Sequence, residues 1–89
     1  MAVIRKKVVV QNSQGLHARP AAVFVQIANK FDSRITVIRD NEKVNGKSIM
    51  GILMLGAEKG SVIELEAEGV DAELALIELE KHISSEEKL

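Results

Sequence analysis

The segment 61–68 constrains the fold more than any other, because apolar and acidic side chains alternate along it from Ile63 to Glu68. Ile63, Leu65 and Ala67 fall on one side of an extended chain, and glutamates at positions 64, 66 and 68 fall on the other. A strand with this pattern belongs to a sheet that has one solvated face and one covered face. Other parts of the chain must therefore supply the cover.

Two helices that can cover the sheet are predicted from apolar residues at three- and four-residue spacing. The first runs from Ala18 to about Lys30 and carries Pro20 in its first turn, where a missing amide costs no intrahelical bond. The last follows Asp71, which we expect to cap it. The expected buried stripes are Ala21, Phe24, Val25, Ala28 and Phe31 in the first helix, and Ala72, Ala75, Leu76, Leu79 and Ile83 in the last.

Segments rich in β-branched residues predict further strands. One contains Ile4, Val8 and Val10 on one face, and segment 33–39 forms a hairpin with a short strand around Lys43. The aspartate and asparagine between the two hairpin strands supply the turn. These strands give the sheet enough width to need cover from more than one helix.

The apolar run from Ile49 to Leu55 shows no alternation, and we assign it to a short helix with Ser48 as its N-cap and Gly56 at its end. A buried strand remains the alternative. The resulting order, β-α-β-β-α-β-α, predicts an α+β fold, an open-faced two-layer sandwich in which helices cover one face of a mostly antiparallel sheet.

Composition limits the classes of function. A chain of 89 residues predicts one domain over residues 1–89, too small for a deep catalytic cleft. The net charge of −1 gives no bulk attraction for nucleic acid or an anionic membrane, and the chain has no cysteine for a disulfide or thiolate metal site. No apolar run is long enough to insert into a membrane, and no signal peptide is evident, so we expect a cytoplasmic protein.

The candidate chemical site is a histidine where the first strand gives way to the first helix, within the string Gly15-Leu16-His17-Ala18-Arg19-Pro20. A neutral imidazole can attack an activated phosphorus. The amides of Ala18 and Arg19 and the positive end of the helix can receive the phosphoryl group, and the Arg19 guanidinium can pair with its oxygens. The alternative is an ordinary exposed histidine beside a solvated arginine.

A second candidate is Ser48. Its position as an N-cap would by itself explain a serine, but a phosphoryl group there would face the positive end of a helix. The residues that follow form an apolar surface too large for so short a helix to bury, and flexible methionines suit a surface that docks several proteins. They are Ile49, Met50, Leu53 and Met54, of which at least two could instead belong to the core.

Three other patterns do not predict a site. Gly46-Lys47-Ser48 resembles the end of a nucleotide-binding loop, but the glycine required five residues earlier is Asn41. The alternating glutamates lack the histidine or cysteine ligands of a metal site and are expected to be a solvated face. His82 lies near the end of the last helix, where a protonated imidazole complements the helix dipole.

Two motifs together resemble a known family. They are residues 15–21, in which Ala21 follows the string quoted above, and Val44-Asn45-Gly46-Lys47-Ser48-Ile49-Met50-Gly51. The chain is similar, essentially from end to end, to the histidine-containing phosphocarrier (HPr) family of the bacterial phosphoenolpyruvate-dependent phosphotransferase system. That resemblance implies four antiparallel strands with three helices on one side, and a phosphocarrier rather than a free-standing enzyme.

The resemblance also implies roles and partners. Enzyme I would phosphorylate His17 at Nδ1, Arg19 would assist transfer, and an EIIA domain would receive the phosphoryl group for sugar uptake. An HPr kinase/phosphorylase would modify Ser48, which would then signal to a transcription regulator. We expect a monomer without cofactor or metal. Partners are expected to dock around His17 on a surface formed by Leu16, Ala22, Ile49, Met50 and Leu53.

Two alternatives remain at this point. The segment 44–57 also resembles the nitrogen-related paralogue NPr, which implies a regulatory carrier or binding module that controls transcription or metabolism, although Pro20 favours the sugar-transport form. A small hydrolase that uses His17 as general base, with Ser13 close in sequence, lacks the third member of a triad. Gln14 departs from the short polar residue that many family members carry before the glycine.

Overall fold

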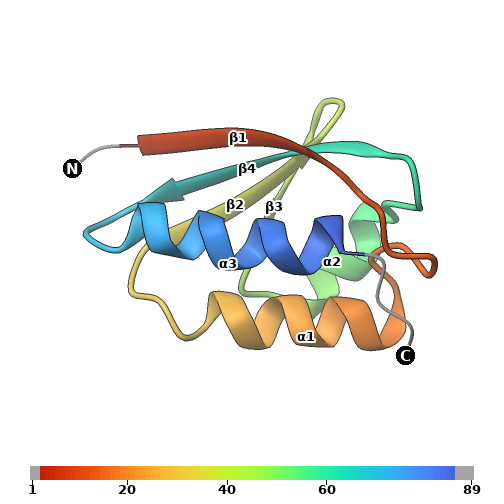
Figure 1. The fold of residues 1–89 in the computed structure, drawn as a ribbon, viewed down its shortest axis with the longest axis horizontal. Helices are drawn as coiled ribbons and strands as arrows, with labels where there is room; N and C mark the ends of the chain where they lie inside the picture. The colour runs from red at the N-terminus through yellow and green to blue at the C-terminus, as the bar shows by residue number, and fades with distance from the viewer. Residues whose placement is uncertain (1–2, 86–89) are drawn as a thin grey trace.

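The predicted sandwich is confirmed by the computed structural model, which describes residues 3–85 (Figure 1). Its elements follow the predicted order. In chain order they are β1 (Val3–Val9), α1 (Ala18–Ala28), β2 (Arg34–Arg39), β3 (Glu42–Asn45), α2 (Ile49–Leu55), β4 (Val62–Glu68) and α3 (Ala72–Ser84). The α+β class and the two layers are therefore correct.

The sheet has four strands in the order β1-β4-β2-β3, and every neighbouring pair is antiparallel. β4 thus lies inside the sheet, with Leu65 opposite Lys6 on β1 and Val37 on β2. In Figure 1 the three helices lie on one side of the sheet, with α1 and α3 side by side and α2 near the end of the molecule where α1 begins. No helix of residues 3–85 lies on the other side of the sheet.

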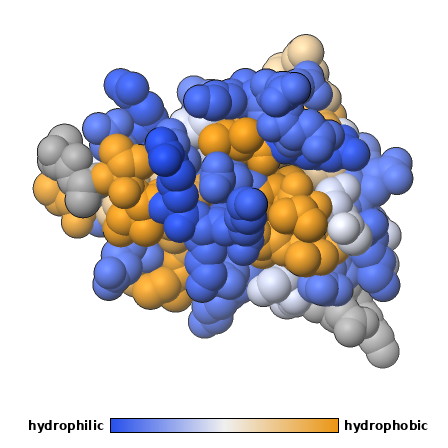
Figure 2. Space-filling view, turned by 90° about the horizontal axis from the view of Figure 1, so that it is seen from above, coloured by the Kyte–Doolittle hydropathy of each residue, from blue (hydrophilic) through white to orange (hydrophobic). Residues whose placement is uncertain are grey.

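The alternation along β4 produces the two faces that the sequence predicts. Ile63, Leu65 and Ala67 are at most 1% exposed and meet the helices. On the open face the side chain of Glu66 forms an ion pair of 2.7 Å with Arg5. Figure 2 looks onto the sheet side of the molecule and shows hydrophilic side chains across its middle, with apolar areas to either side. None of the helices among the described residues has the length and apolarity needed to cross a bilayer.

The helix α2 begins and ends where the sequence places it, so the buried-strand alternative is wrong. Ser48 Oγ accepts a hydrogen bond of 3.1 Å from the Gly51 amide, as an N-cap does. Gly56 ends the helix in the left-handed region, with φ of 63°. Arg39 adds a contact that the sequence does not reveal, because its Nη1 donates to the Leu55 carbonyl at 3.0 Å.

The helix α1 stops at Ala28, two residues before the expected end at Lys30. After Asn29 the chain tightens, because the amides of Lys30 and Phe31 donate to carbonyls three residues earlier, at 3.1 and 3.2 Å, instead of four. Val25 is only partly buried, whereas the rest of the expected stripe of this helix lies in the core.

Asp71 occupies the N-cap position of α3, but the expectation that its side chain caps this helix is wrong. Its carboxylate instead accepts hydrogen bonds from the amides of Asp32 and Ser33, both at 2.9 Å, and from the Ser33 hydroxyl. The two amides lie just before β2 and are otherwise unpaired donors at a chain bend. Asp71 therefore joins the start of α3 to the start of β2.

His82 is also placed differently from the expectation. It is 8% exposed, and its Nε2 lies 3.0 Å from the Pro20 carbonyl in α1. A carbonyl oxygen can only accept, so Nε2 carries the proton in this contact. The ring therefore joins α3 to the first turn of α1 from inside the molecule, rather than compensating a helix dipole at the surface.

The hydrogen bonds to Asp71 predict an acid-sensitive contribution to stability. The Ser33 hydroxyl, followed by the Asp32 amide, lowers the pKa of Asp71 below its ordinary value of 3.8. A carboxyl group whose pKa is lowered by folding stabilises the native state above its unfolded pKa, and this contribution disappears as the pH falls through the folded pKa. We expect the free energy of unfolding to fall less steeply below about pH 4 in Asp71→Asn than in the wild type. Urea denaturation across a pH series measures the two slopes, and parallel curves would contradict the prediction.

Candidate functional site

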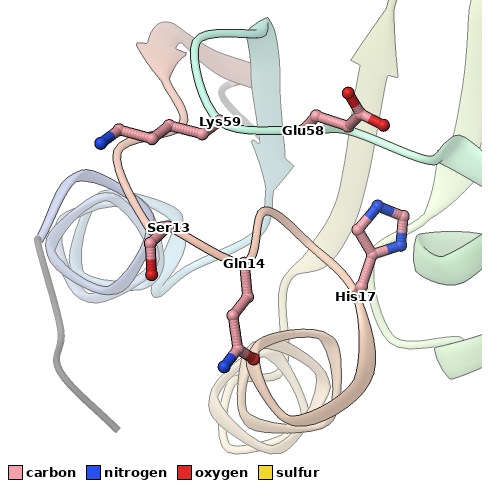
Figure 3. A pocket seen from close by; sticks show the side chains of 5 residues that line it. All are labelled: Ser13, Gln14, His17, Glu58 and Lys59. Atoms are coloured by element: carbon pink, nitrogen blue, oxygen red, sulfur yellow. The ribbon is translucent and has the colours of Figure 1, made fainter.

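His17 lies at the N-cap position of α1, with its side chain exposed. Its backbone is extended, with φ of −117° and ψ of 159°, and its ring makes no capping bond to the helix. The imidazole is therefore available to a visiting group. Figure 3 shows the ring extending away from the loop that leads into α1.

The next residue, Ala18, has φ of +46°, in the left-handed region. This conformation is uncommon for a residue with a Cβ and costs about 1–2 kcal/mol. It turns the chain sharply between the histidine and the helix. Residues held in such conformations gather at functional sites, where the surrounding structure keeps them in place.

Hydrogen-bond donors for an anion are present beside the ring. The first amides of a helix have no intrahelical partner, and here these belong to Ala18 and Arg19. Pro20 has no amide, and the Ala21 amide donates weakly to the His17 carbonyl at 3.4 Å. The Arg19 side chain is exposed and takes part in none of the ion pairs found within residues 3–85. The start of α1 therefore offers two amides and an exposed guanidinium as hydrogen-bond donors.

The loop that carries His17 is fixed by a close contact with a second loop. The Leu16 amide donates to the Ala57 carbonyl at 2.7 Å. Gly15 has φ of +64°, and a Cβ there would lie 2.6 Å from the Ala57 oxygen and 2.9 Å from the Glu58 Cα. Only glycine allows two backbone segments to approach so closely in this conformation. The contact sets the position from which the His17 side chain leaves the chain.

Asn12 shapes the start of the same loop and has no sequence signal that would identify it. Its side-chain oxygen accepts from the Gln14 amide at 2.9 Å, and its carbonyl accepts from the Gly15 amide at 2.9 Å. The side chain is 2% exposed, and its Nδ2 finds no partner. Asn12 thus forms the turn through the backbone amide of Gln14, so this contact does not depend on the Gln14 side chain.

The expectation that Leu16 belongs to the docking surface is wrong. The side chain is 1% exposed and belongs to the core cluster. A strand-to-helix loop can place one residue outward and its neighbour inward, and here His17 faces solvent while Leu16 anchors the loop. Leu16 therefore cannot contact a partner.

A shallow hollow of about 320 Å³ opens beside His17. Its walls are Ser13, Gln14, His17, Glu58 and Lys59. In Figure 3 the Ser13 side chain points away from the imidazole, and no hydrogen bond joins the two among those found in the structure. A nucleophile and its base must be within hydrogen-bond reach, so this arrangement does not favour the hydrolase alternative.

The second candidate, Ser48, is partly buried and starts α2. The apolar residues after it are exposed, at 43% for Ile49, 65% for Met50, 38% for Leu53 and 74% for Met54. The alternative that at least two of them belong to the core is wrong, because Ile52 and Leu55 fill that role. Together these four residues form the α2 surface.

The α2 surface lies near the histidine. The helices α1 and α2 pack against each other, and Figures 1 and 3 both place α2 beside the end of α1 that carries His17. The Lys47 Nζ donates to the Phe31 carbonyl at 2.6 Å, which fixes the start of α2 against the segment after α1. Ala22, the remaining predicted docking residue, is partly exposed on α1. Within residues 3–85, no group of three metal-ligating side chains is close enough to hold an ion.

An exposed histidine at a helix start, in a shallow site on an open-faced sandwich, is the arrangement of a protein that meets its partners at the surface. The family model described as "PTS HPr component phosphorylation site" matches residues 4–85. The chain belongs to this family of HPr phosphocarrier proteins.

Individual relatives agree with that assignment. The chain is 48% identical over 79 residues to phosphocarrier protein HPr of Treponema pallidum, which covers 89% of this chain and 90% of the relative. The crystal structure of an HPr from Bacillus anthracis superposes with a TM-score of 0.91 at 47% identity, covering 93% of this chain and 99% of the other. The catabolite repression protein Crh of Bacillus subtilis, solved as a swapped dimer, has a TM-score of 0.73 at 44% identity and covers 90% and 92%.

The contact between the two loops predicts a strong requirement for glycine at position 15. We expect Gly15→Ala to lower the free energy of unfolding by about 2–3 kcal/mol, because the added Cβ brings both a left-handed strain and a backbone clash. Gly60→Ala is the matched control, since Gly60 has φ of +91° but nothing within 4 Å of the added Cβ. It should cost only about 1 kcal/mol. Equal losses in urea denaturation would contradict the proposed clash.

Proposed function

We propose that this chain is a phosphocarrier of the phosphoenolpyruvate-dependent phosphotransferase system. It accepts a phosphoryl group from phospho-enzyme I on His17 and passes it to an EIIA domain. The supporting observation is the exposed imidazole at the start of α1, next to helix amides that have no intrahelical partner. Family membership supports the carrier role.

The transfer itself requires few groups from this chain. The Nδ1 lone pair of neutral His17 forms a bond to phosphorus as the bond between phosphorus and the donor breaks, and the donor keeps that electron pair. The proton on Nε2 remains on the ring during attack. Transfer to the next partner reverses these events, with the acceptor atom supplying the new lone pair.

The neighbouring residues bind the phosphoryl oxygens without enclosing them. The amides of Ala18 and Arg19 provide donors at the positive end of α1, and the Arg19 guanidinium provides a charged donor on a flexible side chain. An open site of this kind stabilises the phosphoryl group only moderately. Moderate stabilisation suits a carrier, because the group must leave as readily as it arrives.

The same face supplies the docking surface. Ala22 on α1 and three members of the α2 surface, Ile49, Met50 and Leu53, flank the histidine and leave apolar area exposed. Methionine adapts its shape to different partners. We propose that enzyme I and EIIA use this surface in turn.

Ser48 provides the proposed regulatory site. Its Oγ caps α2 in the unmodified protein, so a phosphoryl group there would face the positive end of the helix and bring negative charge to the α2 surface. An HPr kinase/phosphorylase would add it, and a transcription regulator would recognise the product. The similarity to the catabolite repression protein Crh favours a second candidate function, a regulatory carrier of the Crh or NPr kind that does not serve sugar uptake.

We further propose that residues 1–89 form one domain that acts as a cytoplasmic monomer without cofactor or metal. The swapped dimer of Crh is the specific observation that favours a dimer instead. Size-exclusion chromatography with light scattering at micromolar concentration separates the two, and a mass of two chains would contradict the monomer.

The role of His17 predicts the result of a phosphorylation experiment. Incubation with phosphoenolpyruvate and enzyme I should add one phosphoryl group to the wild type and to His82→Gln, but none to His17→Ala. Mass spectrometry under alkaline conditions, which preserve phosphohistidine, measures the product. An unmodified wild type, or a modified His17→Ala, would overturn the proposed function.

The α2 surface predicts the effect of a buried charge at the interface. Met50→Asp should reduce kcat/KM of enzyme I for this protein by roughly tenfold or more, because an aspartate would be desolvated on docking. Val70→Asp is the matched control, since Val70 is 86% exposed between β4 and α3. It should leave the rate unchanged. Equal effects of the two substitutions would remove the docking assignment.

A further inference from the structure

The acidic side chain of Glu58 lies at the proposed phosphorylation site, although the proposed transfer steps at His17 do not require it. Glu58 and His17 line the same hollow, although 40 intervening residues separate them in the sequence. A carboxylate is an unexpected neighbour for a group that must receive a phosphoryl dianion.

The position of Glu58 is fixed by backbone contacts on both sides. Its Cα would lie 2.9 Å from a Cβ built on Gly15, the residue two before His17. Its own amide donates to Ser61 Oγ at 3.0 Å, and its carbonyl accepts from the Ser61 amide at 2.9 Å. The Ser61 carbonyl in turn accepts from the Val10 amide at 2.9 Å. The side chain therefore leaves from a rigid point in direct contact with the histidine loop.

Glu58 forms no ion pair within residues 3–85. The ion pairs found there join Arg5 to Glu66, Lys6 to Glu80 and Lys30 to Glu78. Its sequence neighbour Lys59 also lines the hollow. In Figure 3, however, the Lys59 side chain extends to the opposite side, whereas the Glu58 carboxylate lies on the side of the imidazole.

We propose that Glu58 lowers the stability of the phosphoryl group on His17 through charge repulsion. This inference rests on the proposed phosphocarrier function. A phosphoryl group carries a charge of about −1.5 to −2 near neutral pH, and a fixed carboxylate across a shared hollow disfavours it. Arg19 and the helix amides attract the same group. The balance between the two keeps the phosphoryl group weakly held and ready for transfer.

The test compares three proteins at one phosphoenolpyruvate-to-pyruvate ratio with catalytic enzyme I. Glu58→Gln removes the charge and keeps the size and backbone contacts of the side chain, so the equilibrium ratio of phosphorylated to free protein should rise roughly two- to fivefold at low salt. Glu68→Gln is the matched control, because it removes the same charge from the open face at the far end of β4. It should leave the ratio unchanged.

A second readout separates charge from structure. In a ³¹P NMR titration, the pKa of the phosphoryl group on His17 should be lower in Glu58→Gln than in the wild type, since a nearby carboxylate disfavours the dianion. The difference should shrink as salt is added, because both charges are exposed to solvent. Denaturation curves check that the variants fold equally.

The outcomes distinguish the two proposals. If the wild type gains no phosphoryl group, the proposed function fails. If the wild type is phosphorylated but Glu58→Gln shows the same ratio and the same phosphoryl pKa, the role of Glu58 is overturned. An equal rise in Glu68→Gln would also overturn it, because net charge rather than position would then be the cause.

Discussion

The site depends on the close contact between the loop before α1 and the loop before β4. The hydrogen bond from the Leu16 amide to the Ala57 carbonyl, at 2.7 Å, and the absence of a side chain at Gly15 bring these two backbones together. Leu16 then fills the core while His17 turns to solvent. One backbone contact thereby places the backbone of His17 and the backbone of Glu58 beside each other.

A second level of organisation joins the helices to this site. The His82 ring reaches the Pro20 carbonyl from within the molecule, and Lys47 reaches the Phe31 carbonyl in the segment after α1. The first turn of α1 and the segment that follows the helix are therefore both held by side chains from distant parts of the chain. This support keeps the start of α1 and the α2 surface in a fixed relation, which a docking face for successive partners requires.

The sequence allows most of the fold and the main site residue to be predicted, because these follow from local patterns. Alternation identifies β4, apolar spacing identifies α1 and α3, and a serine and a glycine mark the ends of α2. The errors concern residues whose partners are distant in the chain. Asp71 bonds to Ser33, 38 positions away, and His82 to Pro20, 62 positions away. Neither the burial of Leu16 nor the position of Glu58 beside His17 follows from local sequence, since both depend on how two loops meet.

The pairing of β1 with β4 has a consequence for synthesis of the chain. Val3 lies opposite Glu68, so β1 has its hydrogen-bonding partner only after synthesis has passed residue 62. Closure of so long a loop is entropically costly and slow compared with local helix formation. During translation the histidine segment would leave the ribosome well before residues 57–58, its structural support, are available. Acquisition of a competent surface is thus coupled to synthesis of the segment up to β4, and a product truncated before residue 57 would present the motif without its geometry.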